Sequence, residues 1–204
     1  MRLHWHPFSL FPRRVRVALF EKGIGCDEVV VDLPGGALQT AAFRRLNPFG
    51  QVPVLEDDGV VLYESVAILE YLEERHPSPR LLPPGIRDRA LARQWMLASG
   101  DYLTPPFKRW LARLFSPEEQ RNRDDEARAA VDIAAHLDVL EHALDGRDYL
   151  AGDFSLADIC YVPFVCEMSA IGLGELVESR PHLQSWIEKL NARASVRASA
   201  SASL

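Results

Sequence analysis

Apolar residues come in short runs over the first third of the chain and recur at helical spacing over the rest. Residues 1–5 predict a strand with Leu3 and Trp5 on one face, ended by His6-Pro7, and residues 27–33 predict a second strand flanked by Gly and Pro. The second run contains three consecutive valines and predicts a buried strand. Between them, helical periodicity from Pro12 to Gly23 predicts a helix whose arginines lie off its apolar face (Arg13, Arg14, Arg16). A strand, a helix and a strand in this order predict a parallel pair with a right-handed crossover.

The stretch from Asn47 to Ser65 predicts a turn, a strand opened by Val52-Pro53, a hairpin, a second strand and a helix start. Proline is tolerated at the first position of a strand, and an X-Pro bond there can be cis. If it is cis, the backbone of Val52 turns away from the sheet and can pair with an extended peptide. Glu64 and Ser65 stand where free helical N–H groups favour a carboxylate. The pattern suggests a small peptide with an α-amino acid end as the ligand.

The second half of the chain has helical periodicity throughout. The proline-rich segment from His76 to Gly85 has none, which predicts a linker. Beyond it, apolar spacing predicts four helical segments, the first of which is broken by Pro105-Pro106 (86–115, 124–144, 155–169, 181–193).

Ser155 and Asp158 have the spacing of a reciprocal capping box at the start of a helix. The tail from Ala194 to Leu204 is low in complexity and is expected to fray. The predicted fold class is α/β plus all-α. It comprises a thioredoxin-like domain, a linker and an all-helical C-terminal domain (1–77, 78–86 and 87–204).

Composition limits the classes of partner. Hydrophobic residues make up 48% of the chain and charged residues 25%, which is typical of globular proteins. A net charge of −6 argues against nucleic acid as a main partner. No apolar run approaches the roughly 20 residues of a membrane span, and three cysteines without a CxxC pair favour a reducing compartment. We expect a soluble cytoplasmic protein without membrane or nucleic-acid binding. His4 and His6 have no further ligand in sequence, so no metal is expected.

The order Asn-Pro-x-Gly-x-Val-Pro-x-Leu, hairpin and Glu-Ser resembles the glutathione-binding half of the cytosolic glutathione transferases. The Ser-x-x-Asp helix start and the pattern Arg-Pro-His-Leu-x-x-Trp from Arg180 extend this resemblance over nearly the whole chain. It is nearest to bacterial, serine-type members with a first loop of the zeta, phi or theta kind. It implies glutathione as co-substrate, a homodimer and a role in detoxification. The residues implied in glutathione binding are Val52, Pro53, Glu64, Ser65, Gln51 and Gln39, with Arg44 beside them.

The resemblance also implies a catalytic hydroxyl between the first strand and the first helix. Ser9 stands there, five residues before Arg14-Val15-Arg16, a spacing similar to that of the zeta and phi transferases. A free thiol has a pKa of about 8.5, and lowering it by two units requires about 2.7 kcal/mol of thiolate stabilisation. A hydroxyl donor supplies about 1.5–3 kcal/mol and a helix N-terminus about 0.3–2 kcal/mol. The alternative role of Ser9 is an ordinary turn or cap serine.

The implied reaction is attack of the glutathione thiolate on a small apolar electrophile, that is, transfer of an alkyl or aryl group to glutathione. No cysteine occurs in the first loop, which argues against thiol–disulfide exchange. The alternative function is a non-catalytic, transferase-like protein that binds or docks on other proteins. Candidate residues of the electrophile pocket are aromatic, although aromatics at helical spacing are also typical of a core (Phe8, Phe11, Tyr102, Phe107, Trp110).

Overall fold

The structure is a computed structural model, and it describes residues 1–200. The chain divides into two compact units. The first comprises Met1–Leu82 and the segment that begins at Arg193, and the second comprises Pro83–Ala192. The division after Leu82 falls within the predicted linker, whereas the segment from Arg193 groups with the first unit and not with the helices before it.

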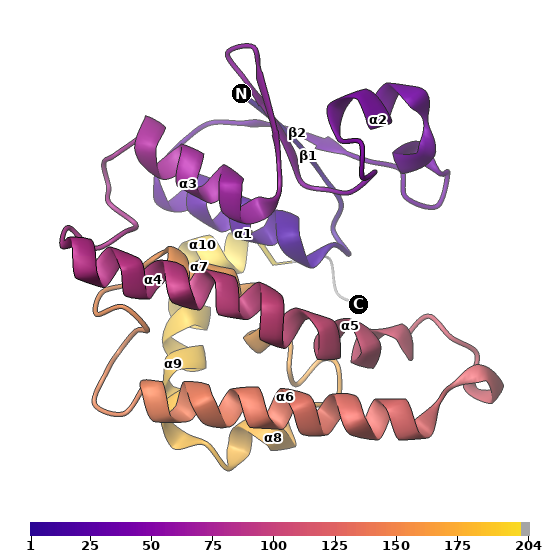
Figure 1. The fold of residues 1–204 in the computed structure, drawn as a ribbon, viewed down its shortest axis with the longest axis vertical. Coiled ribbons are helices and arrows are strands. Elements are labelled where there is room, and N and C mark those ends of the chain that lie inside the picture. Colours follow the sequence, from indigo (N-terminus) through magenta and orange to yellow (C-terminus); the bar gives the residue numbers. More distant parts are fainter. Residues whose placement is uncertain (201–204) are drawn as a thin grey trace. The chain divides into compact units, whose positions relative to one another are not determined.

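A four-stranded sheet forms the centre of the first unit, in the order β2-β1-β3-β4 (Figure 1). β1 pairs in parallel with β2 and antiparallel with β3, and β3 pairs antiparallel with β4. This confirms the predicted thioredoxin-like fold. The elements are β1 (Arg2–Trp5), α1 (Leu10–Glu21), β2 (Asp27–Val30), η1 (Ala37–Gln39), α2 (Ala41–Leu46), β3 (Val54–Asp57), β4 (Val60–Tyr63), α3 (Ser65–Arg75) and α10 (Ala194–Ala198).

Helices cover both faces of this sheet because successive residues of a strand point to opposite sides. Phe43 of α2 packs in one cluster with Val52 and Val54, and its ring also lies edge-on to His4. The neighbouring positions on the other face, Leu3 and Leu55, are fully buried. α1 and α3 pack side by side on the opposite side of the sheet from α2 (Figure 1).

The sequence predicts a buried strand at residues 27–33. The strand is present, but the prediction of its burial is wrong. β2 is exposed along its length, with Val30 at 57% of its full exposure. β2 is an edge strand, with a neighbour on one side alone. Only Val31, just beyond the strand, is buried in the cluster around Phe43. The run of three valines therefore reflects the preference of β-branched residues for strands and not burial on both faces.

The arginines of α1 lie off its aliphatic face, as predicted, but two of them do not face solvent. Arg13 and Arg14 are buried, with 5% and 2% of their surface exposed. Arg13 donates to the Ser199 hydroxyl at 3.4 Å, and Arg14 donates to the Ser65 hydroxyl at 3.2 Å. α1 thus presents buried polar groups to two other segments of the first unit.

A buried ion pair holds the end of α1 to α3. The Lys22 ammonium, whose side chain is fully buried, lies 2.6 Å from the Glu73 carboxylate. Lys22 also donates to the carbonyl oxygens of His76 and Pro79, and Glu73 accepts the N–H groups of the next chain segment (Leu81, Leu82). Every charge of the pair is therefore hydrogen-bonded, which is the condition under which buried pairs are tolerated.

The expectation that the tail frays is wrong for residues 194–198, which form α10. Arg193 donates two hydrogen bonds of 2.8 Å to the Glu21 carboxylate at the end of α1, and Ser195 donates a third. Burial raises the pKa of Glu21. These hydrogen bonds and the charge of Arg193 lower it by more than burial raises it, so the net shift is downward. Residues 201–204 of the tail lie outside the described residues.

The second unit is helical, as predicted. The break predicted at Pro105-Pro106 lies earlier in the chain, at the π-helical turn η2. The two prolines fall in the first turn of the next helix, α5. Proline is tolerated there because first-turn N–H groups have no helical partner. The elements are α4 (Ile86–Ala98), η2 (Ser99–Leu103), α5 (Thr104–Ala112), η3 (Glu118–Gln120), α6 (Arg123–Ala143), α7 (Leu156–Val165), α8 (Glu175–Glu178) and α9 (Pro181–Ala192).

The capping box predicted at Ser155 is present, and it starts the fully buried helix α7. The Asp158 carboxylate accepts the Ser155 N–H at 2.9 Å and also the Leu150 N–H and the Trp186 indole N–H, each at 3.0 Å. Burial raises the pKa of Asp158 to about 6, although these donors oppose the shift. One carboxylate therefore joins the loop before α7, the start of α7 and α9.

His136 of α6 stacks on Tyr161 of α7, with ring centroids 5.7 Å apart and Nε2 at 3.2 Å from the phenol oxygen. Burial lowers the pKa of His136 from 6.5 to about 4. The ring is therefore neutral at physiological pH, as suits its contact with an aromatic ring.

We expect Glu73→Gln to lower the free energy of unfolding by about 3–5 kcal/mol, because the substitution leaves the buried Lys22 ammonium without a counterion. Urea denaturation followed by circular dichroism measures this change. The control is Arg75→Gln on the same helix, since Arg75 pairs with Asp58 at 3.9 Å on the exposed surface. Its effect should stay below about 1 kcal/mol. Equal effects of the two substitutions would contradict the assignment.

His136 should make the protein less stable in acid. The unfolded histidine binds a proton below a pH of about 6.5, whereas the folded one resists protonation until about pH 4, so falling pH favours unfolding in this window. Against His136→Gln, wild-type stability should fall by roughly 2 kcal/mol between those pH values, after allowance for the partial exposure of the ring. Denaturation series at stepped pH measure the difference in stability between the two proteins. Asp158 has the opposite pH trend, but both proteins contain it, so its contribution cancels. Parallel curves for the two proteins would refute this role.

Candidate functional site

The peptide bond between Val52 and Pro53 is cis, as the sequence analysis allowed. Val52 precedes β3, and its side chain is buried in the cluster around Phe43. Within residues 1–200, neither its N–H nor its C=O forms a backbone hydrogen bond. The backbone at the start of β3 is thus outside the sheet ladder.

Asn47 and Gly50 shape the turn that leads into this strand. The buried Asn47 side chain accepts the Phe49 N–H at 3.0 Å and donates to the Gln51 carbonyl at 2.8 Å, so it closes the turn from both sides. Gly50 has φ +60°, and a Cβ there would lie 2.9 Å from the Leu38 carbonyl. Only glycine meets both conditions without strain.

The pairing of β3 with β4 brings Glu64 to the same end of the hairpin as Pro53. Val54 pairs with Tyr63, so Pro53 and Glu64 are the next residues outward on the two chains. Glu64 is exposed and has φ +69°, which is unusual for a residue other than glycine. Strained backbone of this kind is typical of functional sites.

Ser65 is the first residue of α3 and is buried. Its backbone N–H belongs to the first turn, where N–H groups have no helical partner. Its hydroxyl accepts the hydrogen bond from Arg14 of α1. The sequence analysis did not assign Arg14 to the site, because nothing along the chain distinguishes it from Arg13 and Arg16 of the same helix.

Ser9 is the N-cap residue of α1 and is half-buried. Its N–H donates to the His6 carbonyl at 3.0 Å, which closes the turn after β1. Its side chain makes no capping hydrogen bond to α1. Of the alternative roles, turn or cap serine, the cap role is not supported, because a cap hydroxyl accepts an N–H of the first turn, whereas the backbone hydrogen bond to His6 is compatible with the turn role.

Gln39, Arg44 and Gln51 are exposed near this end of the sheet. Arg44 donates to the Gln39 side-chain oxygen and to the Pro48 carbonyl, each at 2.5 Å. Gln51 takes part through its carbonyl in the turn held by Asn47.

The five aromatic residues considered for an electrophile pocket come from both units, and each is described within its own unit. Phe8 is exposed, and the Phe11 ring lies 5.1 Å from the Arg14 guanidinium carbon. In the helical unit, Trp110 donates to the Ile171 carbonyl at 3.0 Å. Phe107 is fully buried and packs edge-on against Phe164, so its ring belongs to the core. Tyr102 lines a cavity of the helical unit.

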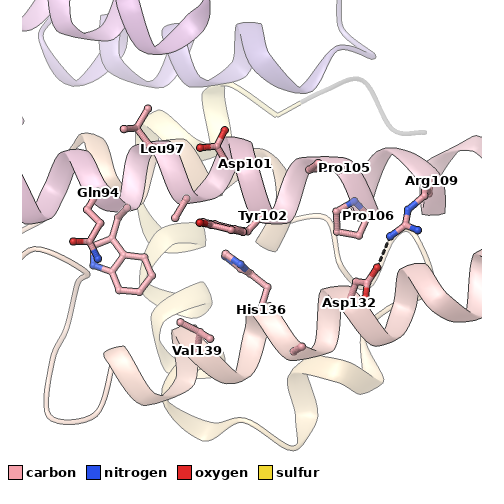
Figure 2. A pocket seen from close by; sticks show the side chains of 13 residues that line it. Gln94, Leu97, Asp101, Tyr102, Pro105, Pro106, Arg109, Asp132, His136 and Val139 are labelled. Atoms are coloured by element: carbon pink, nitrogen blue, oxygen red, sulfur yellow. Dashed lines mark hydrogen bonds and ion pairs between the residues drawn. The ribbon is translucent and has the colours of Figure 1, made fainter.

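That cavity has a volume of about 940 Å³ and lies between the α4–η2–α5 segment and α6 (Figure 2). Tyr102 and His136 approach each other across it, and the ion pair of Arg109 with Asp132 lies at one end (Figure 2). Its other lining residues come from the same helices. The sequence analysis missed this cavity, because the residues of α6 that line it were not distinguishable from an ordinary exposed helix face.

Within residues 1–200, no group of three or more His, Cys, Asp and Glu side chains could hold a metal ion. Among the same residues, no helix is both long and apolar enough to cross a membrane. The candidate site offers serine hydroxyl, carboxylate, guanidinium and backbone groups.

Two family profiles match the chain. Residues 8–75 match the glutathione S-transferase N-terminal domain, and residues 103–194 match the glutathione S-transferase C-terminal domain. Among curated proteins, the chain is 34% identical to glutathione S-transferase F10 of Arabidopsis thaliana, over 92% of this chain and 91% of that protein. It is 29% identical to glutathione S-transferase APIC of Nicotiana tabacum, over 95% of this chain and 93% of that protein.

Solved structures agree with these matches. Glutathione transferase F7 from Populus trichocarpa is similar with a TM-score of 0.89 and 27% identity, over 98% of this chain and 97% of that one. A glutathione transferase from Burkholderia graminis, with two glutathione molecules bound per subunit, has the same TM-score and identity, over 97% of this chain and 86% of that one. By sequence and by fold, the chain belongs to the glutathione S-transferase family.

Proposed function

We propose that this protein forms the thiolate of glutathione beside Ser9 and transfers glutathione to small apolar electrophiles. The chain is a glutathione transferase by family, and glutathione is its co-substrate. In the reaction the thiolate sulfur forms a bond to an alkyl or aryl carbon, and the leaving group departs with the electron pair of its bond. The observation that supports Ser9 is its position at the start of α1 with a hydroxyl that does not cap the helix.

A hydroxyl at this position can donate to sulfur without breaking another contact of α1. Such a bond to a charged acceptor stabilises the thiolate by about 1.5–3 kcal/mol. The N-terminus of α1 adds about 0.3–2 kcal/mol, since its unpaired N–H groups attract negative charge. Together these terms reach the roughly 2.7 kcal/mol needed to lower a thiol pKa by two units, and no general base is required.

The other end of glutathione is proposed to lie at the end of the β3–β4 hairpin. The N–H and C=O of Val52 would pair with the cysteinyl backbone, held in place by Pro53 and the turn before it. The α-carboxylate of the γ-glutamyl group would bind Ser65 and the N-terminus of α3, and its amine would bind the exposed carboxylate of Glu64. Gln51 and Gln39 would contact the remaining polar groups of the peptide.

We infer further that this is a serine-type transferase with a first loop of the zeta, phi or theta kind, active in the cytoplasm as a homodimer. The bacterial affiliation predicted from the sequence stays a prediction, since similar structures come both from Burkholderia graminis and from Populus trichocarpa. Phe8, Phe11, Tyr102 and Trp110 stay as predicted contacts of the electrophile, and Phe107 is withdrawn because it is a core residue. A non-catalytic docking protein, the alternative function, has no need of glutathione.

Ser9→Ala should leave the affinity for glutathione nearly unchanged but raise the pKa of the bound thiol by about 1–2 units, because one donor to sulfur is lost. Calorimetry measures the affinity, and ultraviolet absorbance of the thiolate during a pH titration measures the pKa. The turnover rate at neutral pH should fall about 10- to 100-fold and recover at high pH, where the thiol ionises unaided.

Ser9→Thr is the matched control, since it keeps a hydroxyl at the same position. Its bound thiol should stay close to the wild-type pKa. An unchanged thiolate titration in Ser9→Ala would remove Ser9 from the proposed role. Absence of glutathione binding by the intact protein would favour the docking alternative.

Substitutions of Glu64 should separate stability from binding. Glu64→Gly removes the side chain that disfavours φ +69°, so it should raise the free energy of unfolding by about 1 kcal/mol over Glu64→Ala, which retains the strained backbone. Both variants should bind glutathione at least about 10-fold more weakly, because both lose the carboxylate that pairs with the amine. Thermal denaturation and calorimetry give the two readouts. Wild-type affinity in the more stable glycine variant would exclude Glu64 from the binding site.

A further inference from the structure

Arg14 places a buried positive charge directly behind Ser65. Arg14 is 2% exposed, and its Nη1 donates to the Ser65 hydroxyl oxygen at 3.2 Å. The two residues lie 51 positions apart, Arg14 in the second turn of α1 and Ser65 at the first position of α3. The ring of Phe11, one turn earlier on α1, covers the guanidinium at 5.1 Å.

This hydrogen bond has a directional consequence for Ser65. A hydroxyl has one proton to donate and lone pairs to accept. Because Arg14 occupies a lone pair of the Ser65 oxygen, the hydroxyl proton points away from the guanidinium. A hydroxyl that accepts from a cation is also a stronger donor, since hydrogen bonds in a chain polarise one another. Ser65 is thereby prepared to donate both its O–H and its helical N–H to an anion.

The guanidinium also acts through its charge. A charge with little exposure is screened less by salt and water than a surface charge, so its field reaches groups bound on the far side of Ser65. An arginine stays charged at every physiological pH. The start of α3 therefore combines unpaired N–H groups, an oriented hydroxyl and a fixed positive charge.

We propose that Arg14 is a positioning residue for the γ-glutamyl α-carboxylate, and that it selects ligands with a carboxylate at this position by orienting Ser65 and supplying charge behind it. This inference rests on the proposed function, in which that carboxylate binds at the start of α3. It adds a residue that does not itself touch the ligand. Arg14 thus determines which γ-glutamyl-type peptides bind, and not how the thiol reacts.

The test pairs Arg14→Met with three peptides in titration calorimetry. Glutathione has both the α-amine and the α-carboxylate of its glutamyl group, glutaryl-Cys-Gly lacks the amine, and 4-aminobutyryl-Cys-Gly lacks the carboxylate. In Arg14→Met the dissociation constants of the first two should rise by about 10- to 100-fold. The constant of 4-aminobutyryl-Cys-Gly should stay within about twofold of its wild-type value, because this peptide has no carboxylate to lose. Thiol pKa values of bound glutathione should not change.

Arg13→Met is the matched control. Arg13 is the neighbouring buried arginine of the same helix, but its hydrogen bond runs to Ser199 of the C-terminal segment. This variant should bind all three peptides as the wild type does. Arg14→Lys, measured in parallel, keeps the charge and should show the same dependence on the ligand carboxylate at smaller amplitude, even if Arg14→Met proves unstable.

Equal weakening of all three peptides in Arg14→Met and Arg14→Lys would overturn the proposal, because it would show a general structural role. Unchanged binding of glutathione in both variants would overturn it as well. Failure of the wild-type protein to bind any of the three peptides is a different result, which would reject the glutathione site itself and this inference with it.

Discussion

The register between β3 and β4 is the constraint on which the candidate site depends. Val54 pairs with Tyr63, and this pairing alone brings Pro53 and Glu64 to the same end of the hairpin. Asp58 and Gly59 both have positive φ, which matches a two-residue hairpin turn and fixes the register. A slip of one residue would turn every side chain of the hairpin to the opposite face, so the buried face also holds the register.

Charged side chains fix α1 relative to its neighbours within the first unit. Arg14 donates to Ser65 of α3, and Lys22 pairs with Glu73, which is also on α3. Glu21 accepts hydrogen bonds from Arg193, which precedes α10. Replacing buried ion pairs by apolar residues is often neutral for stability, so such pairs are weak evidence that a protein needs them to fold. Their directional bonds do restrict how α1 can shift or rotate, and the placement of Ser9 and Ser65 depends on that restriction.

Local sequence signals predicted most of the fold correctly. The hairpin, the capping box at Ser155 and the helix end at Lys22-Gly23 each depend on residues a few positions apart, so a single sequence contains the information. The failures concern partners distant in sequence. The exposure of β2 depends on its place at the sheet edge, and the burial of Arg14 depends on a contact across 51 residues. Phe107 shows the same limit within a helix, because a core aromatic and a pocket aromatic have the same spacing along the chain.

Much of the candidate site follows from one helix. Ser9 starts α1, and Arg14 lies five residues later, an axial rise of about 7.5 Å. In the proposed function Ser9 faces the sulfur of glutathione, while Arg14 acts through Ser65 on the γ-glutamyl carboxylate. The groups that act on the sulfur and on the γ-glutamyl carboxylate are thus both positioned by the same helix. A displacement of α1 would misplace both together, whereas a change in the electrophile pocket would leave both in place. Under this proposal, substitutions on the electrophile side can change the second substrate without moving the groups that hold the thiol donor.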